Sequence, residues 1–265
     1  MLLLSLVGCM TMDSFFFNGV PLTQYSLESE VIPPELLEEV SFENEDGGTL
    51  YGVWAHQPAG GAQTWLYFHG NAANIDEYMP QFEILWQLGV EAFIFDYRGY
   101  GKSEGSPTFD GVIQDGAAAI DYVAEHQGVT SEDVVFHALS LGGMVALHNA
   151  DDFPPKVIIT EDTFASGQKI MDDGSGLDMP QGWMLEDEWD NTLAAAEVHS
   201  PYLVMHGQAD DFIKPDAGDA LYAAANEPKR LWRVPGANHA ETPFVATEDY
   251  EELLLCWADQ TCPEE

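Results

Sequence analysis

The chain has 265 residues, of which 46% are hydrophobic, so it can bury the core of one large α/β domain or two small ones. Its 46 acidic residues against 8 basic residues give a formal net charge of -38. This charge excludes nucleic acids and disfavours polyanionic substrates, because binding phosphates requires clustered lysine and arginine side chains. The acidic residues are spread along the chain, which predicts a solvated acidic surface of the kind found in salt-adapted proteins.

The first ten residues, MLLLSLVGCM, are apolar but too few to span a bilayer. Residues 6–9 (LVGC) resemble the lipobox of bacterial lipoprotein signals, in which Cys9 would become the lipidated N-terminus. No lysine or arginine precedes the apolar run, which departs from the usual signal. We expect residues 1–9 to be a lipoprotein signal that anchors an exported protein to the bacterial cell envelope. The alternative is a frayed apolar N-terminus on a cytoplasmic protein.

Residues 10–39 show no clear period and are expected to be a tether that leads into a domain over residues 40–265. The domain opens with an antiparallel hairpin around the turn Asp46-Gly47-Gly48. Short apolar runs then predict strands at 64–70, 91–99, 133–140, 156–162, 202–207 and 230–236. Helical spacing and closing glycines predict helices at 76–89, 109–128, 141–150, 215–226 and over the last twenty residues.

Alternation of apolar strands with helices is typical of a mainly parallel sheet covered by helices on both faces. We therefore expect an α/β fold with a mainly parallel eight-stranded sheet and an N-terminal antiparallel hairpin. Residues 162–200 form the one long irregular stretch. Such a stretch in a compact domain is usually functional, so we expect a short lid-like insert there.

Two cysteines remain after Cys9. Cys256 and Cys262 lie near the end of the last predicted helix and just beyond it. The pair predicts either a disulfide formed in an oxidising compartment or two unrelated thiols. No cysteine or histidine spacing fits a zinc site, so no metal is expected.

Polar side chains follow several of the predicted strands, where active groups of a parallel α/β sheet collect. Ser140 ends the strand VVFHAL and is followed by Gly142 and Gly143. A strand-to-helix turn this sharp exposes a nucleophile and needs small neighbours, here Ala138 and Gly142. An ordinary serine N-cap is the alternative. Asp210 and His239 follow two later strands, and Ser…Asp…His is the chain order of α/β-hydrolases.

The sequence resembles α/β-hydrolase-fold serine hydrolases, in particular the small set with little or no cap. The matching segments are GTLYGVW, YFHGNAANI, FDYRGYGKSEGSPT, ALSLGG, HGQADDFIKP and PGANHAE, in the family's order. The resemblance implies that Ser140 is the nucleophile, Asp210 the acid in preference to Asp211, and His239 the base. It also implies that the backbone amides of Asn71 and Leu141 form the oxyanion hole, and that no cofactor is needed.

We therefore expect a serine hydrolase that cleaves a small-molecule carboxylic ester or thioester. A catalytically inactive binding module on the same fold stays open, as does C–C bond hydrolysis or cofactor-free peroxidation. Other polar residues are expected to be structural: Arg98 as a partner of acidic side chains, and His69 and His206 as buried supports.

Overall fold

The computed structural model describes residues 16–172 and 189–262. An eight-stranded sheet forms the centre of the domain, in the order β10-β9-β8-β7-β4-β6-β3-β2. The strands are β2 (Leu37–Glu43), β3 (Thr49–Ala55), β4 (Thr64–Phe68), β6 (Glu91–Asp96), β7 (Val134–Leu139), β8 (Val157–Glu161), β9 (Tyr202–Gly207) and β10 (Lys229–Val234). β3 pairs antiparallel with β2 and with β6, and all other pairs are parallel, which confirms the predicted fold class.

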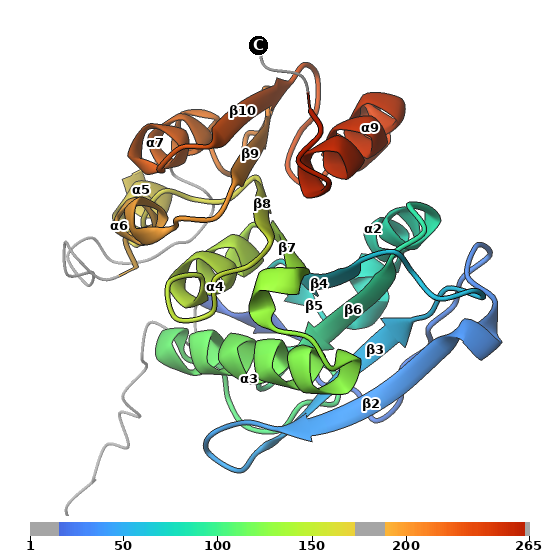
Figure 1. The fold of residues 1–265 in the computed structure, drawn as a ribbon. Helices are drawn as coiled ribbons and strands as arrows, with labels where there is room; N and C mark the ends of the chain where they lie inside the picture. Colours follow the sequence, from blue (N-terminus) through green and yellow to red (C-terminus); the bar gives the residue numbers. More distant parts are fainter. Residues whose placement is uncertain (1–15, 173–188, 263–265) are drawn as a thin grey trace, which may run out of the picture.

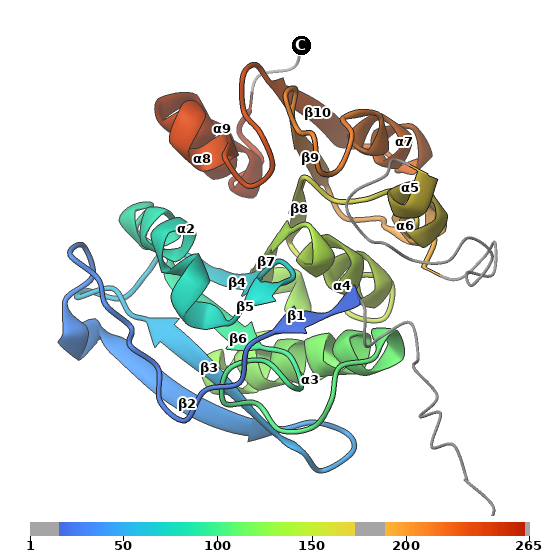
Figure 2. The ribbon, with the colours of Figure 1, turned by 180° about the vertical axis from the view of Figure 1, so that it is seen from behind.

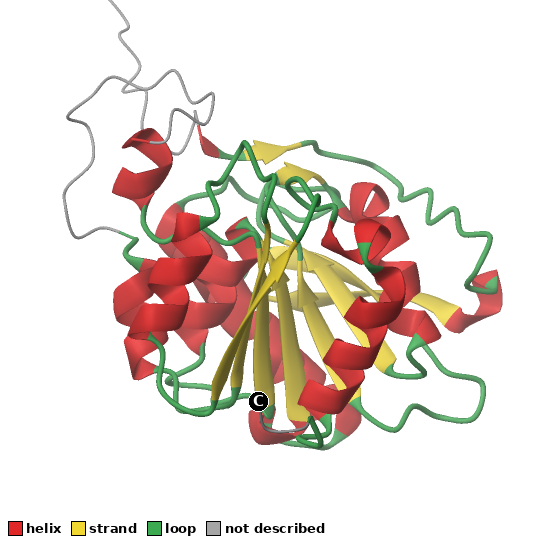
Figure 3. Cartoon of the chain, turned by 90° about the horizontal axis from the view of Figure 1, so that it is seen from above, coloured by secondary structure: helices red, strands yellow, loops and turns green. Residues whose placement is uncertain are grey.

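Helices cover both faces of this sheet (Figure 1; Figure 3 shows them from above). One face carries α3 (Phe109–Gln127), α4 (Leu141–Asn149), α6 (Asn191–Glu197) and α7 (Asp216–Ala224). The other face carries α2 (Ile75–Gln87) and α9 (Thr247–Ala258), with the short α8 (Thr242–Val245) leading into α9. Two apolar clusters, one on each face, hold the layers together, so the central strands are buried throughout.

Local signals set the helix boundaries. Asn74 caps α2 by accepting a hydrogen bond from the Asp76 amide at 3.1 Å. Thr108 caps α3 in the same way through the Gly111 amide, and Gly128 ends that helix in the left-handed conformation that glycine tolerates. Short 3-10 turns, η1 (Pro34–Leu36) and η2 (Ser131–Asp133), lead into β2 and β7.

The segment expected to be a tether packs against the domain from Phe16 onward (Figure 2). Phe16, Tyr25 and Ile32 are buried, and β1 (Asn18–Gly19) pairs in parallel with β5 (Ala72–Ala73). The structure therefore differs from the expectation, because isolated aromatic residues in a segment without period find places in the core. This packing brings the N-terminal segment close to the loop after β4.

The expected insert contains two helices in its described parts, α5 (Gly167–Asp172) and α6, while residues 173–188 lie outside the described residues. At the other end of the chain, Cys256 and Cys262 form a disulfide across a sequence separation of 6. The last helix, α9, ends at Ala258, earlier than the sequence predicts.

None of the helices in the described part of the chain is long and apolar enough to cross a membrane. Cys9 and the whole of residues 1–9 lie outside the described residues. Lipidation of Cys9, export and anchoring to the cell envelope stay predictions.

Candidate active site

The predicted catalytic residues come from loops at one edge of the sheet, where the parallel strands end. Ser140 lies between β7 and α4, Asp210 follows β9, and His239 follows β10. Asn71 lies between β4 and β5. Because parallel strands place their carboxyl ends together, residues far apart in the sequence meet there.

The backbone at Ser140 is held in an uncommon conformation. Its φ is 53° and its ψ is -110°, in the region of positive φ that non-glycine residues rarely adopt. The Ser140 amide donates a hydrogen bond to the Glu161 carbonyl at 2.8 Å. A Cβ at Gly142 would lie 2.0 Å from the Phe68 carbonyl oxygen, so this position requires glycine. Ala138, by contrast, fits into the apolar core with its methyl group.

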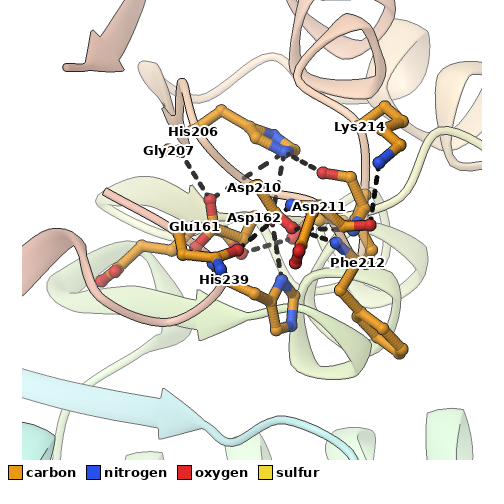
Figure 4. A network of polar contacts seen from close by, with 12 residues as sticks. Glu161, Asp162, His206, Gly207, Asp210, Asp211, Phe212, Lys214 and His239 are labelled. Atoms are coloured by element: carbon orange, nitrogen blue, oxygen red, sulfur yellow. Dashed lines mark hydrogen bonds and ion pairs between the residues drawn. The ribbon is translucent and has the colours of Figure 1, made fainter. Parts of the chain in front are cut away.

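Asp210 and His239 form a hydrogen-bonded pair. The Nδ1 atom of His239 lies 2.8 Å from Oδ2 of Asp210 (Figure 4). The second oxygen, Oδ1, accepts hydrogen bonds from the Phe212 and Ile213 amides at 2.9 and 2.8 Å. The neighbouring Asp211 is exposed, and the carboxylate that contacts the imidazole is that of Asp210.

Opposing effects act on the pKa of Asp210. Burial alone would raise this pKa, but the contacts with His206 and His239 and the amide of Ile213 outweigh burial, and the pKa is lowered. The carboxylate therefore stays ionised at neutral pH. With Nδ1–H of His239 donated to this anion, the Nε2 atom is left as the proton acceptor.

Ser140 and His239 line one cavity of about 400 Å³. Asn71, Tyr78, Gln81 and Phe212 also contribute to its wall. No hydrogen bond joins the Ser140 hydroxyl to the imidazole in the described structure, and such contacts often tighten only when substrate binds. Ser140 and His239 thus meet at one cavity, and Asp210, which does not line it, contacts the imidazole of His239.

The predicted oxyanion amides of Asn71 and Leu141 have no hydrogen-bond acceptor among the described residues. Leu141 is the first residue of α4, where amides lack partners within the helix. The side chain of Asn71 is held firmly: its oxygen accepts from the Asn18 amide at 3.0 Å and from the Tyr100 hydroxyl, and its amide donates to the Phe16 carbonyl. The N-terminal segment therefore helps to fix the loop that carries one of the two predicted oxyanion amides.

The residues expected to be structural occupy supporting positions. Arg98 pairs with Asp115 and Asp46, at 2.7 and 2.9 Å. His69 is fully buried, with Nδ1 2.8 Å from the Gly70 carbonyl, and His206 is buried with Nε2 2.9 Å from the Ile213 carbonyl.

Sequence reasoning missed Asn18, Tyr78 and Gln81 as cavity residues. Tyr78 lines the cavity with a hydroxyl that accepts a hydrogen bond from the Ala72 amide at 2.8 Å. Tyr78 and Gln81 stand three residues apart on α2, so they share a helix face, and this spacing is the one signal the sequence offers for them. Asn18 carries no signal of its own.

Asp162, directly after β8, was also missed. Among the described residues, it offers a carboxylate oxygen within 4.8 Å of the ligand atoms of Asp210 and His239, a grouping that could hold a metal ion. Hydrogen bonds to backbone amides already engage both oxygens of Asp162.

The sheet order, the turn at Ser140 and the Asp–His pair define an α/β-hydrolase-fold protein. A family described as serine aminopeptidase, S33, matches residues 62–160. The Salmonella typhi protein YfhR is 32% identical over 225 residues, which cover 78% of this chain and 76% of that protein. The α/β hydrolase domain-containing protein WAV2 of Arabidopsis thaliana is 29% identical over 251 residues, covering 86% and 80%.

Solved structures with the same fold include the Pyrococcus furiosus esterase Pf2001, with a TM-score of 0.76 and 19% identity over 94% of this chain and 98% of that one. An acetyl xylan esterase from Paenibacillus sp. R4 has a TM-score of 0.69 and 19% identity, covering 88% of this chain and 86% of that one. At this identity the likeness shows the fold alone. The sequence relatives show that the chain belongs to the α/β-hydrolase family, and the protein is therefore a hydrolase.

Proposed function

We propose that the protein is a serine hydrolase that cleaves a carboxylic ester or thioester through an acyl-enzyme on Ser140. The observation that carries the proposal is the shared cavity: Ser140 and His239 line it together, while Asp210 holds the far side of the imidazole at 2.8 Å. A binding module would not require an ionised carboxylate aligned on a histidine beside a strained serine.

In the acylation step, Nε2 of His239 takes the hydroxyl proton of Ser140 as Oγ attacks the acyl carbon. The carbonyl oxygen becomes an oxyanion and accepts hydrogen bonds from the amides of Asn71 and Leu141. The bond to the leaving oxygen or sulfur then breaks, and His239 returns the proton to the departing alcohol or thiol.

Water completes the reaction. His239 takes a proton from a water molecule that attacks the acyl-enzyme, and the same two amides hold the second oxyanion. Collapse releases the carboxylic acid, and Ser140 regains its proton from His239. Throughout, the anion of Asp210 stabilises the imidazolium that forms in each half-reaction.

Hydrolysis of nitrophenyl esters and of a matched thioester tests this proposal. We expect Ser140→Ala to lower kcat by roughly 10,000-fold or more, because nucleophile and base act as one unit. Ser131→Ala is the matched control, since Ser131 lies in η2, which precedes β7, whereas Ser140 follows the other end of that strand. Equal hydrolysis by wild type and Ser140→Ala would overturn the proposal.

The cavity also supports a preference for positively charged substrates. Glu77 on α2 lines it, and neither lysine nor arginine is among its lining residues. An acidic side chain at the cavity wall, with no cationic side chain beside it, suits a substrate that carries an ammonium group.

An ester pair that differs only in an amino group and its neutral isostere tests this preference. Because Glu77 is exposed to solvent, we expect Glu77→Gln to reduce the ratio of the two kcat/KM values by only about fivefold. Glu83→Gln, on the same helix but outside this cavity, should leave the ratio unchanged. A ratio that Glu77→Gln does not alter would remove Glu77 from substrate recognition.

A further inference from the structure

Asp162 is a buried carboxylate that the reaction described above does not use. It directly follows β8, is 0% exposed, and has a φ of 47°. A non-glycine residue rarely adopts this left-handed conformation, so the surrounding structure must hold it there. Hydrogen bonds to distant segments supply that hold.

Each oxygen of Asp162 accepts a backbone hydrogen bond from a different catalytic loop. Oδ1 accepts from the Gly207 amide at 2.8 Å, and Gly207 ends the strand that leads to Asp210. Oδ2 accepts from the amide of Ala240 at 2.8 Å, and Ala240 directly follows His239. One side chain thus joins the acid loop to the base loop (Figure 4).

The backbone at the same place contacts the nucleophile. The carbonyl of Glu161 accepts the hydrogen bond from the Ser140 amide at 2.8 Å. The amide of Asp162 donates to the Met205 carbonyl at 3.0 Å, within the strand that leads to the acid. Two adjacent residues therefore contact all three segments that carry the catalytic groups.

Charge links Asp162 to the same site. A carboxylate oxygen of Asp162 lies within 4.8 Å of a carboxylate oxygen of Asp210 and of a ring nitrogen of His239. Nε2 of His206 is 3.9 Å from Oδ1 of Asp162. Burial raises the pKa of Asp162, while the nearby imidazoles of His206 and His239 act to lower it. The negative charge of the Asp162 carboxylate attracts the positive charge that His239 carries during the reaction.

We propose that Asp162 is a positioning residue, which sets the place of His239 and Asp210 relative to Ser140. The inference rests on the proposed acyl transfer. If the hydrogen bonds of Asp162 are lost, the loop that carries His239 shifts and the imidazole moves away from the Ser140 hydroxyl. Misplacement on the scale of 1 Å can cost about 100-fold in rate.

The variant Asp162→Asn tests this role, because it keeps the shape but turns one acceptor oxygen into a donor that faces an amide. We expect kcat per titrated active site to fall roughly 10- to 100-fold with KM nearly unchanged. We also expect the acid limb of the kcat/KM profile to move to lower pH, since Asp162→Asn removes the attraction between a carboxylate and the positive charge on His239.

Glu91→Gln provides the matched control. Glu91 is buried at the start of β6, at the opposite edge of the sheet, and its Oε1 accepts backbone hydrogen bonds from Gln57 and Gly61. Its substitution should lower the melting temperature as Asp162→Asn does, yet leave kcat per active site and the pH profile unchanged.

A second variant keeps the test decisive if Asp162→Asn folds poorly. Asp162→Glu retains the charge but displaces the carboxylate by one methylene, so kcat should fall without the shift of the acid limb. A folded Asp162 variant with kcat and pH profile like those of wild type would overturn the inference. Absence of hydrolysis in the wild type would instead remove the proposed function itself.

Discussion

At the scale of single residues, the site depends on an anion kept at a buried position. Asp210 is 3% exposed, and its pKa is lowered because the contacts with His206 and His239 and the Ile213 amide outweigh burial. A carboxyl group whose folded pKa lies below its unfolded value of about 3.9 stabilises the fold above that value. This stabilisation is lost as the pH falls through the folded pKa.

Substitution of Asp210 by asparagine tests what this anion contributes to catalysis and to the stability of the fold. We expect Asp210→Asn to lower kcat by roughly 10,000-fold, because the imidazole loses the anion that fixes its tautomer. Urea unfolding of both proteins over a pH series measures stability. The deficit of the variant should be largest near neutral pH and shrink below about pH 4; a deficit that stays constant would show that the charge contributes nothing.

At the scale of elements, the junction of β7 and α4 determines whether Ser140 can react. The close approach of Gly142 to the Phe68 carbonyl lets α4 start directly at the end of the strand. On the other side of the serine, the methyl of Ala138 is part of the core, so glycine is not required at this position.

Exchanging alanine and glycine at Gly142 and at Ala138 distinguishes the requirements of the two positions. Gly142→Ala should abolish hydrolysis, since its Cβ would lie 2.0 Å from a carbonyl oxygen and force the turn open. Ala138→Gly should retain activity and lose only about 1 kcal/mol of stability, from backbone entropy and a lost methyl contact. Nitrophenyl ester assays and thermal unfolding measure both effects; loss of activity in Ala138→Gly would mean that the methyl group shapes the site.

At the scale of the whole molecule, we expect the net charge to control how stability depends on salt. A formal net charge of -38 on 265 residues repels itself at low ionic strength, and added salt screens this repulsion. We expect the melting temperature to rise with NaCl concentration, and an equal ionic strength of KCl to act alike. A flat or falling curve would show that self-repulsion does not limit stability.

The sequence predicts what regular patterns encode. Buried strands that end in polar residues placed Ser140, Asp210 and His239 at one edge of a parallel sheet, and the structure has them there. The choice of Asp210 over Asp211 as the predicted acid needed the family resemblance, because spacing alone does not distinguish adjacent acids. The prediction of an oxyanion amide at Asn71 needed the same resemblance.

Other features depend on contacts that no local pattern encodes. The strand at Asn18–Gly19 has two residues, too few to show a period, yet it holds the side chain of Asn71. Asp162 is one acid among 46, and its importance comes from amides 45 and 78 positions away. Such residues become visible only after the loops are brought together.

Covalent labelling with a fluorophosphonate tests the central claim most directly. The account predicts that the wild-type protein gains one phosphonyl group, that peptide mapping by mass spectrometry places it on Ser140, and that Ser140→Ala gains none. A wild type that stays unlabelled, or a label on another residue, would contradict the claim that this serine is the activated nucleophile.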